Sequence, residues 1–269
     1  MESGDLIDRI QDLNVWKRGS TRAPHKPLLV LYALGRIERG EDRLIPYREV
    51  DEDLRRLLID FGPPRKSHHP EYPFWRLQND GIWEMPGGEN LERRKSNTDP
   101  RKSELLEKDV RAGFLEEIDA RLREDPALRE RVAAEILHEH FPPTLHEDIL
   151  DAVGLSVGYA TRTRRQRDPE FREAVRRAYR YRCAICRYDL KIERKPVGLQ
   201  ACHIQWHAFG GPDTVKNGIS LCVLHHKLFD RGALHVTADY RIRVSEYVHG
   251  LGPPVERLLE LDGEKAEPP

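Results

Sequence analysis

Four residues in the last third of the chain have the spacing of metal ligands. Cys183 and Cys186 are separated by two residues, and Cys222 and His225 repeat that spacing. Two residues between ligands let a tight turn present both side chains to one tetrahedral ion. The chain has only four cysteines, all clustered here, which indicates metal binding rather than disulfides. The sequence therefore predicts a structural zinc that replaces a core this short segment cannot build.

A second set of polar residues is interleaved with these pairs. His203 follows the remaining cysteine, Asn217 precedes the second pair, and His226 directly follows His225. Asp230 lies four residues after His226, on the same face of a predicted helix. We interpret the remaining cysteine, Cys202, as a small buried residue beside a strand end. Together with a glycine pair between the zinc pairs, this order resembles the HNH (ββα-metal) nuclease family over roughly residues 170–245.

The resemblance implies a role for each residue of this set. Phosphodiester hydrolysis needs a base to activate water and a cation to offset charge on the leaving oxygen. By resemblance, His203 is the general base, Asn217 holds the loop that orients it, and His226 binds the catalytic metal. Asp230 is the expected second ligand, and two ligands with several waters suit Mg²⁺, Mn²⁺ or a similar divalent ion. Many family members carry an acid where this chain has Cys202, which suits zinc better than magnesium.

The composition is that of a two-domain protein without a membrane span. The chain has 269 residues, of which 38% are hydrophobic and 34% charged, and its net charge is −1. No apolar run approaches eighteen residues, and the acidic start lacks the apolar stretch of a signal peptide. We therefore expect a cytoplasmic protein whose contacts with nucleic acid come from local basic patches rather than a uniformly basic coat.

The periodicity of apolar residues predicts an α+β protein. A mainly helical domain with a small β-hairpin covers residues 1–153, and a zinc-stabilised ββα-metal domain covers 169–269. The hairpin is expected where two apolar runs, 74–77 and 82–85, flank Asn79-Asp80-Gly81. Predicted helices in the first domain cover 1–14, a segment containing 28–34, 47–60, 103–110, 114–123, 126–140 and 144–152.

An arginine-rich linker is predicted between the domains, at 154–168. It includes Arg164 and Arg165, and a helix from 169 to about 180 follows it. Beside a nuclease motif, we expect these arginines to contact DNA phosphates. The linker would keep both domains on one duplex and raise the effective concentration of the nuclease there.

Two stretches of the first domain are distinctive. One is Arg22-Ala23-Pro24-His25-Lys26-Pro27, and the other runs from Tyr72-Pro73 through Arg76 to Trp83. Together they resemble the DNA sulfur-binding domain of the McrA-like modification-dependent restriction enzymes. Those enzymes recognise phosphorothioated DNA, in which sulfur replaces a non-bridging phosphate oxygen, and they carry a C-terminal HNH domain.

The residues of these stretches suit the chemistry of that mark. Sulfur is larger, softer and a poorer acceptor than oxygen, so a selective pocket needs an apolar surface and a nearby cation. Tyr72 and Pro73 supply the apolar surface, and His25 and Lys26 supply donors and charge. Arg76 stands where the family uses a small apolar residue, and it could instead hold a neighbouring phosphate or a base edge.

We expect a restriction endonuclease that binds phosphorothioated double-stranded DNA and cuts near the mark, as a homodimer. Two alternatives remain open. The first domain could read another modification such as a methylated base, which such proteins usually flip into an aromatic pocket. Alternatively, the chain could be a zinc-containing DNA-binding protein without catalysis.

Overall fold

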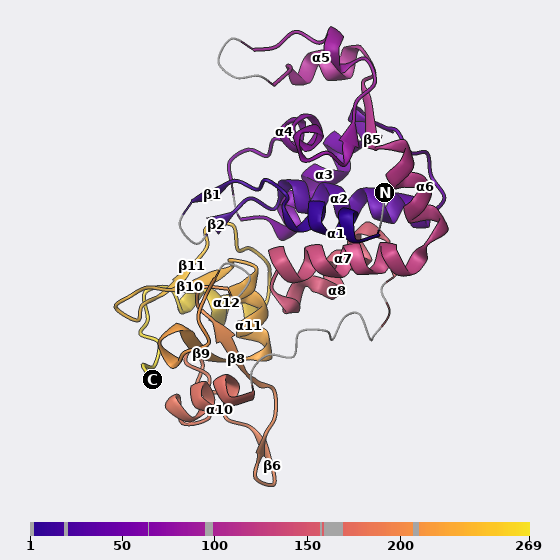
Figure 1. Ribbon diagram of the computed structural model, residues 1–269. Coiled ribbons are helices and arrows are strands. Elements are labelled where there is room, and N and C mark those ends of the chain that lie inside the picture. The colour runs from indigo at the N-terminus through magenta and orange to yellow at the C-terminus, as the bar shows by residue number, and fades with distance from the viewer. Residues whose placement is uncertain are drawn as a thin grey trace. The chain divides into compact units, whose positions relative to one another are not determined.

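The computed structural model describes residues 3–18, 21–63, 65–94, 99–156, 158, 169–206 and 210–269 (Figure 1). The chain divides into two compact units, Met1–Arg164 and Arg165–Pro269. Among the described residues, no helix combines the length and apolar character needed to cross a bilayer.

The first unit is built around one buried helix, α2 (His25–Glu38). Every residue from Pro27 to Ile37 is buried, as expected for a helix that is apolar on all sides. Five other helices pack against it, so α2 forms the centre of the core. These helices are α3 (Tyr47–Phe61), α4 (Glu71–Arg76), α6 (Glu116–Glu124), α7 (Pro126–His140) and α8 (His146–Val153), while α1 (Ser3–Gln11) packs on α7.

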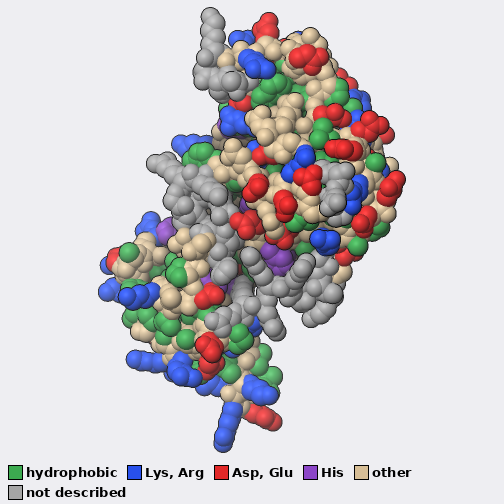
Figure 2. All heavy atoms as spheres, in the orientation of Figure 1, with side chains coloured by type: hydrophobic (Ala, Val, Ile, Leu, Met, Phe, Trp, Pro, Cys, Tyr) green, Lys and Arg blue, Asp and Glu red, His purple; other side chains and the backbone are tan. Residues whose placement is uncertain are grey.

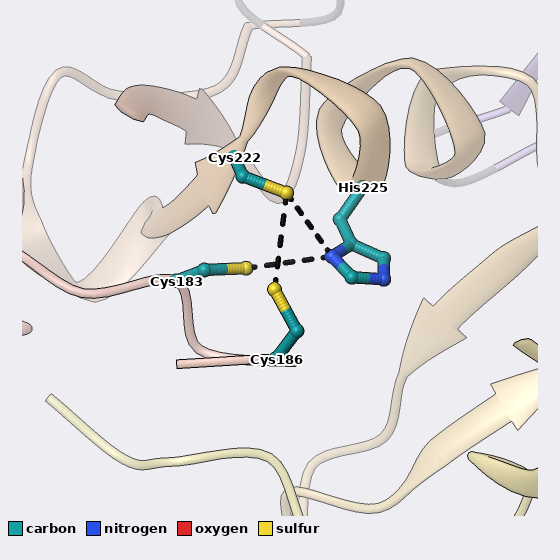
Figure 3. A group of neighbouring side chains, drawn as sticks. All are labelled: Cys183, Cys186, Cys222 and His225. Carbon is teal, nitrogen blue, oxygen red and sulfur yellow. Dashed lines mark hydrogen bonds between the residues drawn. The ribbon is translucent and has the colours of Figure 1, made fainter. Parts of the chain in front are cut away.

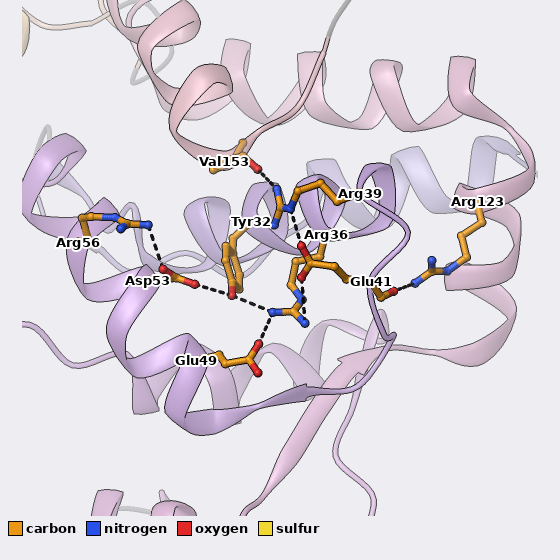
Figure 4. Close-up of polar contacts among 9 residues, drawn as sticks. All are labelled: Tyr32, Arg36, Arg39, Glu41, Glu49, Asp53, Arg56, Arg123 and Val153. Carbon is orange, nitrogen blue, oxygen red and sulfur yellow. Dashed lines mark hydrogen bonds and ion pairs between the residues drawn. The ribbon is translucent and has the colours of Figure 1, made fainter.

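Two arginines at the C-terminal end of α2, Arg36 within it and Arg39 directly after it, are paired within the unit (Figure 4). The buried Arg36 pairs with Glu49 of α3 and, at 3.0 Å, with Glu41. Arg39 donates to the backbone oxygen of Val153, at the end of α8, at 2.7 Å. Because buried polar groups are costly without partners, these contacts fix α2 against α3 and α8 as well as satisfying charge.

Short strands complete the first unit. Strand β5 (Arg111–Phe114) is the middle of an antiparallel three-stranded sheet, between β3 (Ile45–Pro46) and β4 (Trp83–Glu84). A two-residue pair joins β1 (Lys17–Arg18) to β2 (Thr21–Arg22). The remaining helical segments are α5 (Lys102–Glu107), η1 (Leu77–Asp80), η2 (Gly88–Asn90) and η3 (Pro143–Leu145).

The hairpin predicted around Asn79-Asp80-Gly81 is wrong. Residues 74–77 lie in α4 and η1, and Trp83 pairs with Phe114 of β5 instead. Phe74 and Leu77 are both fully buried at a spacing of three, which is helical rather than alternating. Gly81 has a φ of 68° and ends the helical segment in the left-handed conformation, so the same glycine signal marks a helix end here.

The second unit is built on a β-hairpin followed by a helix. Strand β8 (Leu199–His203) pairs antiparallel with β9 (Gly218–Cys222), and α11 (Val223–Asp230) follows at once. Helix α10 (Pro169–Ala178) packs on both strands. Around this centre lie the pairs β6 (Lys191–Ile192) with β7 (Lys195–Pro196) and β10 (Leu234–Val236) with β11 (Ile242–Val244), η5 (Val215–Asn217) and α12 (Pro253–Glu260).

The predicted fold class is confirmed. The first unit is helical with a small sheet, and the second has the ββα arrangement with a cluster of cysteine and histidine ligands. Strand β5 was not predicted: its residues fall in and around the ends of the helices predicted at 103–110 and 114–123.

Candidate functional sites

The four predicted zinc ligands converge in the second unit (Figure 3). Cys183 and Cys186 come from the loop after α10, Cys222 ends β9, and His225 lies in the first turn of α11. His225 Nδ1 lies 3.6 Å from Cys183 Sγ and 3.2 Å from Cys222 Sγ, and the Sγ atoms of Cys186 and Cys222 are 3.9 Å apart. Zinc–sulfur bonds of about 2.3 Å place tetrahedral sulfur ligands about 3.8 Å apart. The donor set therefore fits a structural zinc with little rearrangement.

His203, the predicted base, lies at the end of β8 and is 8% exposed. Its ring stacks on Phe171 of α10, with centroids 4.3 Å apart and an interplanar angle of 15°. Its Nε2 atom lies 2.6 Å from Asp213 Oδ1. These two contacts fix the plane of the imidazole and place a carboxylate beside it. The sequence reasoning missed Asp213, although an acid directly after the Gly210-Gly211-Pro212 turn was a usable signal.

Asn217 clamps the loop that leads from His203 to Asp213. Its Oδ1 accepts from Gln205 N at 2.8 Å, and its Nδ2 donates to the backbone oxygens of Gln205 and Pro212 at 3.0 and 3.1 Å. Gly211 is required at this crossing, because a Cβ there would lie 1.9 Å from Gln205 O. Asn217 thus joins the residues at both ends of this loop, Gln205 and Pro212.

A second group of metal-ligating side chains lies between β8 and α11. The ligand atoms of Cys202, His226 and Asp230 all lie within 4.8 Å of one another. His226 Nε2 is 3.2 Å from Asp230 Oδ2, and its Nδ1 is 2.6 Å from Gln200 Oε1. The predicted ligands His226 and Asp230 therefore lie side by side, and Cys202, which is buried in the core as predicted, lies beside them.

The five DNA-binding residues predicted in the first unit line one pocket of about 390 Å³. Tyr72 and Pro73 come from α4, His25 and Lys26 from the start of α2, and Arg76 from the end of α4. Sequence reasoning missed other lining residues, among them Asn14, Trp16, Arg65 and Asn79. Trp16 is 54% exposed, an unusual position for a tryptophan that could have drawn attention to it.

Two of the cations of this pocket, Lys26 and Arg76, are held by buried carboxylates. Lys26 Nζ lies 2.5 Å from Asp80 Oδ2, and Asp80 also accepts from Asn14 N at 2.8 Å. Arg76 forms two bonds to Asp99, at 2.9 and 2.5 Å, and Asp99 is 1% exposed. Each cation is thereby fixed in position, and neither partner was predicted from the sequence.

The aromatic wall of the pocket is also ordered by contacts. The ring of Tyr72 stacks on His69 at 4.9 Å, and the Arg76 guanidinium lies 4.9 Å from the Tyr72 centroid. Burial, together with the smaller effect of the positive charge of Arg65, lowers the pKa of His25 to about 4. His25 is therefore a neutral imidazole at pH 7. The predicted phosphate contacts Arg164 and Arg165 lie outside the described residues.

Comparisons with known proteins agree with this division. Residues 3–157 match the ScoMcrA-like DNA sulfur-binding domain family, and residues 183–237 match the HNH endonuclease family. The first unit is similar to the sulfur-binding domain of ScoMcrA complexed with phosphorothioated DNA, with 25% identity and a TM-score of 0.50, over 55% of this chain and 94% of that one.

A second similar structure is the sulfur-binding and SRA domains of ScoMcrA, also with phosphorothioated DNA. It shows 26% identity and a TM-score of 0.51 over 55% of this chain, but the match spans only 46% of that chain. A comparison with curated proteins gave no match. The family match covers more than half of the chain, so the protein belongs to the ScoMcrA-like DNA sulfur-binding family, and it joins that domain to an HNH endonuclease domain.

Proposed function

We propose that the chain binds phosphorothioated double-stranded DNA through the pocket between α2 and α4 and hydrolyses phosphodiester bonds near the mark. The observation that carries the proposal is the convergence of His25, Lys26, Tyr72, Pro73 and Arg76 on one pocket. The ScoMcrA domains that resemble this unit were solved with such DNA.

The chemistry of the pocket matches sulfur better than oxygen. Pro73 and the stacked ring of Tyr72 offer a polarizable apolar wall, which a soft sulfur tolerates and a strongly hydrated oxygen does not. The neutral imidazole of His25 adds no charge, so the anionic group relies on Lys26 and Arg65 for attraction. Because Arg76 is held by Asp99, we propose that it orders Tyr72 and contacts a phosphate beside the mark rather than the sulfur itself.

In the second unit, His203 takes the proton from the attacking water. Asp213, 2.6 Å from Nε2, holds the imidazole and stabilises the positive charge that develops on it. Phe171 and the Asn217 clamp keep the ring and the loop in place. His226 and Asp230 would hold a divalent ion, which would supply a positive charge for the leaving oxygen.

Further parts of the proposal rest on charge and geometry. Exposed cations on the β6–β7 pair, Lys191, Arg194 and Lys195, lie on the second unit, where blue side chains gather in Figure 2. With the Arg164 and Arg165 segment, we propose that they contact DNA phosphates.

Cutting both strands requires two active sites, so the active form is a homodimer. A zinc–thiolate cluster is compatible with the reducing cytoplasm, where we place the protein.

The test is a gel-shift titration of the His203→Ala protein at fixed salt. Two duplexes of identical sequence are compared, one with a stereodefined phosphorothioate and one with ordinary phosphate. We expect at least about a hundredfold preference for the sulfur duplex, equivalent to about 2.7 kcal/mol. The preference should disappear in Tyr72→Ala and persist in Tyr247→Ala, an exposed tyrosine of the other unit.

Each alternative predicts a different result. Equal binding to both duplexes would contradict sulfur recognition. If a methylated duplex competes as well as the sulfur duplex, the pocket reads a modified base instead. If the protein with His203 intact binds the sulfur duplex but cuts no DNA with any divalent ion, the chain is a binding protein without catalysis.

A further inference from the structure

Three buried side chains with strong metal-binding chemistry meet between β8 and α11. Cys202 and His226 are each 1% exposed, and Asp230 is 5% exposed. Cys202 Sγ lies 4.0 Å from Asp230 Oδ1, and His226 Nε2 lies 3.2 Å from Asp230 Oδ2. The thiol, imidazole and carboxylate thus converge from a strand and a helix that are packed on each other.

The hydrogen bond on the far side of His226 aims its ring at this point. Nδ1 donates to the side-chain oxygen of Gln200, two residues before Cys202 on the same strand. Nε2 then presents its lone pair toward the Asp230 carboxylate. Two electron-rich atoms at this distance in a buried site are stabilised by a cation between them, either a proton or a metal ion. A hydrogen bond that fixes the non-ligating nitrogen is the usual support of a metal-bound histidine.

From this geometry we propose that Cys202 is the third protein ligand of the nuclease metal, and that the ion is a borderline transition metal such as Zn²⁺ or Co²⁺ rather than Mg²⁺. This rests on the proposed function only in assigning the ion to catalysis. A thiolate and an imidazole favour such ions, whereas Mg²⁺ prefers an all-oxygen octahedral set. Three protein ligands leave a position open for water or a phosphate oxygen, as in catalytic zinc sites.

His203, the residue after Cys202, explains how β8 contributes both to the metal group and to the catalytic base. Successive side chains of a strand point to opposite faces. Cys202 therefore faces α11 and the metal group, while His203 faces α10 and stacks on Phe171. The β8 strand thus holds a ligand and the base in adjacent positions, and substitution of one leaves the contacts of the other in place.

The experiment titrates Co²⁺ into the full-length chain carrying one Zn²⁺, so that the four-ligand cluster stays filled. Thiolate-to-cobalt charge transfer gives a near-ultraviolet band only if a cysteine binds the added ion. We expect one equivalent of Co²⁺ to bind the unsubstituted protein with this band, while zinc content measured in parallel stays at one. His203→Ala, the matched control on the opposite face of β8, should show the same band.

Cys202→Ala should lose the band, and its affinity for the second ion should fall by more than the ~10–100-fold typical of losing an outer partner of a ligand. Cys202→Asp should regain a second ion without the band and should accept Mg²⁺ or Mn²⁺ in DNA cleavage.

Retained zinc and an unchanged melting temperature show that each variant folds. An undiminished band in Cys202→Ala, or a second equivalent without the band in the unsubstituted protein, would overturn the proposal. Because these readouts need no DNA, they stand even if sulfur recognition fails.

Discussion

The two units of the molecule solve the same folding problem with different materials. The first unit has a large continuous core of aliphatic and aromatic side chains gathered around α2. The core of the second unit is much smaller, and three of its members, Cys183, Cys202 and Cys222, are cysteines. A segment of this size buries too little apolar surface to be stable alone, and metal ligation commonly replaces the missing core.

The difference also decides how each unit holds its functional groups. In the first unit, buried carboxylates fix Lys26 and Arg76 on helices that the apolar core already orders. In the second unit, the proposed metal ligands and catalytic residues lie on the β8–β9 hairpin, on α11 and in the loops beside them, so we expect stability and activity to depend on the same few bonds. Perturbing ligands should therefore affect the second unit far more than the first.

The largest expected effect is that of zinc removal. Chelation should unfold the second unit and leave the first folded, because structural zinc contributes on the order of 10 kcal/mol in small domains. Hydrogen exchange read out by mass spectrometry should show lost protection in α10, β8, β9 and α11. Peptides of α2 and α3 should keep theirs.

A matched pair of variants sharpens this prediction. Cys183→Ser should reproduce the effect of chelation. Ser245→Ala, a substitution at a residue outside the group of four ligands, should not. The contrast between the units would be wrong if chelation removed protection equally from α2, or from neither unit.

The next effect concerns catalysis without loss of the fold. Asp213→Asn keeps the size of the side chain but removes the charge beside His203 Nε2. We expect cleavage to fall by about 10²–10⁴-fold, similar to the cost of losing a general base, with His203→Ala at the upper end. Single-turnover cleavage of a saturating sulfur duplex measures the chemical step, and the gel shift measures binding.

Binding to the sulfur duplex should stay unchanged in both variants, since the sulfur pocket lies within the other unit. The control is Asp239→Asn in the same unit. Asp239 is an exposed acid that pairs with Arg241, whereas His203 pairs with Asp213. Full activity in Asp213→Asn would mean that the carboxylate does not assist the base.

The sequence was informative where residue type and short spacing determine geometry. Cys183, Cys186, Cys222 and His225 could be grouped because ligand chemistry tolerates few alternatives, and the long helices because their apolar residues repeat at helical spacing. Tertiary partners were not predictable in this way. Asp80 and Asp99 lie fifty-four and twenty-three residues from the cations they hold, and exposed and buried acids look alike in a sequence.

The misplaced hairpin has a related cause. Asn79-Asp80-Gly81 is compatible with a tight turn and with a helix end, because both need a glycine at positive φ. The choice between them depends on β5, the strand with which β4 pairs. The sequence of β5 has no clear alternation of apolar and polar residues. Local patterns thus identified segments whose residues converge in the fold but could not determine which distant segments pack on them.

A smaller effect tests the ion pair under the pocket. Asp80→Asn removes the partner of Lys26, whose side chain is 11% exposed. Leaving a mostly buried cation unpaired should lower the free energy of unfolding of the first unit by about 2–3 kcal/mol. It should also weaken the sulfur preference, because Lys26 is no longer fixed. Urea denaturation and the gel shift measure the two effects, and Asp5→Asn, from a more exposed i,i+4 pair, is the control. Equal stability of the two variants would show that the pocket does not depend on this pair.

The smallest expected effect is a pH dependence that only the first unit should show through His25. Burial lowers the pKa of His25 from 6.5 to about 4 in the folded protein, so between these values the unfolded chain binds more protons. The stability that neutral His25 allows is therefore complete above pH 6.5 and is lost as pH falls toward 4. A shift of this size, reduced for partial solvent access, corresponds to about 2 kcal/mol. His25→Gln should flatten the curve of unfolding free energy against pH in that window.

Urea denaturation followed by tryptophan fluorescence suits the measurement, since Trp16, Trp75 and Trp83 all lie in the first unit and only Trp206 in the second. His235→Gln, in the second unit, should leave the curve unchanged, and parallel curves for all three proteins would mean that His25 is protonated as easily folded as unfolded.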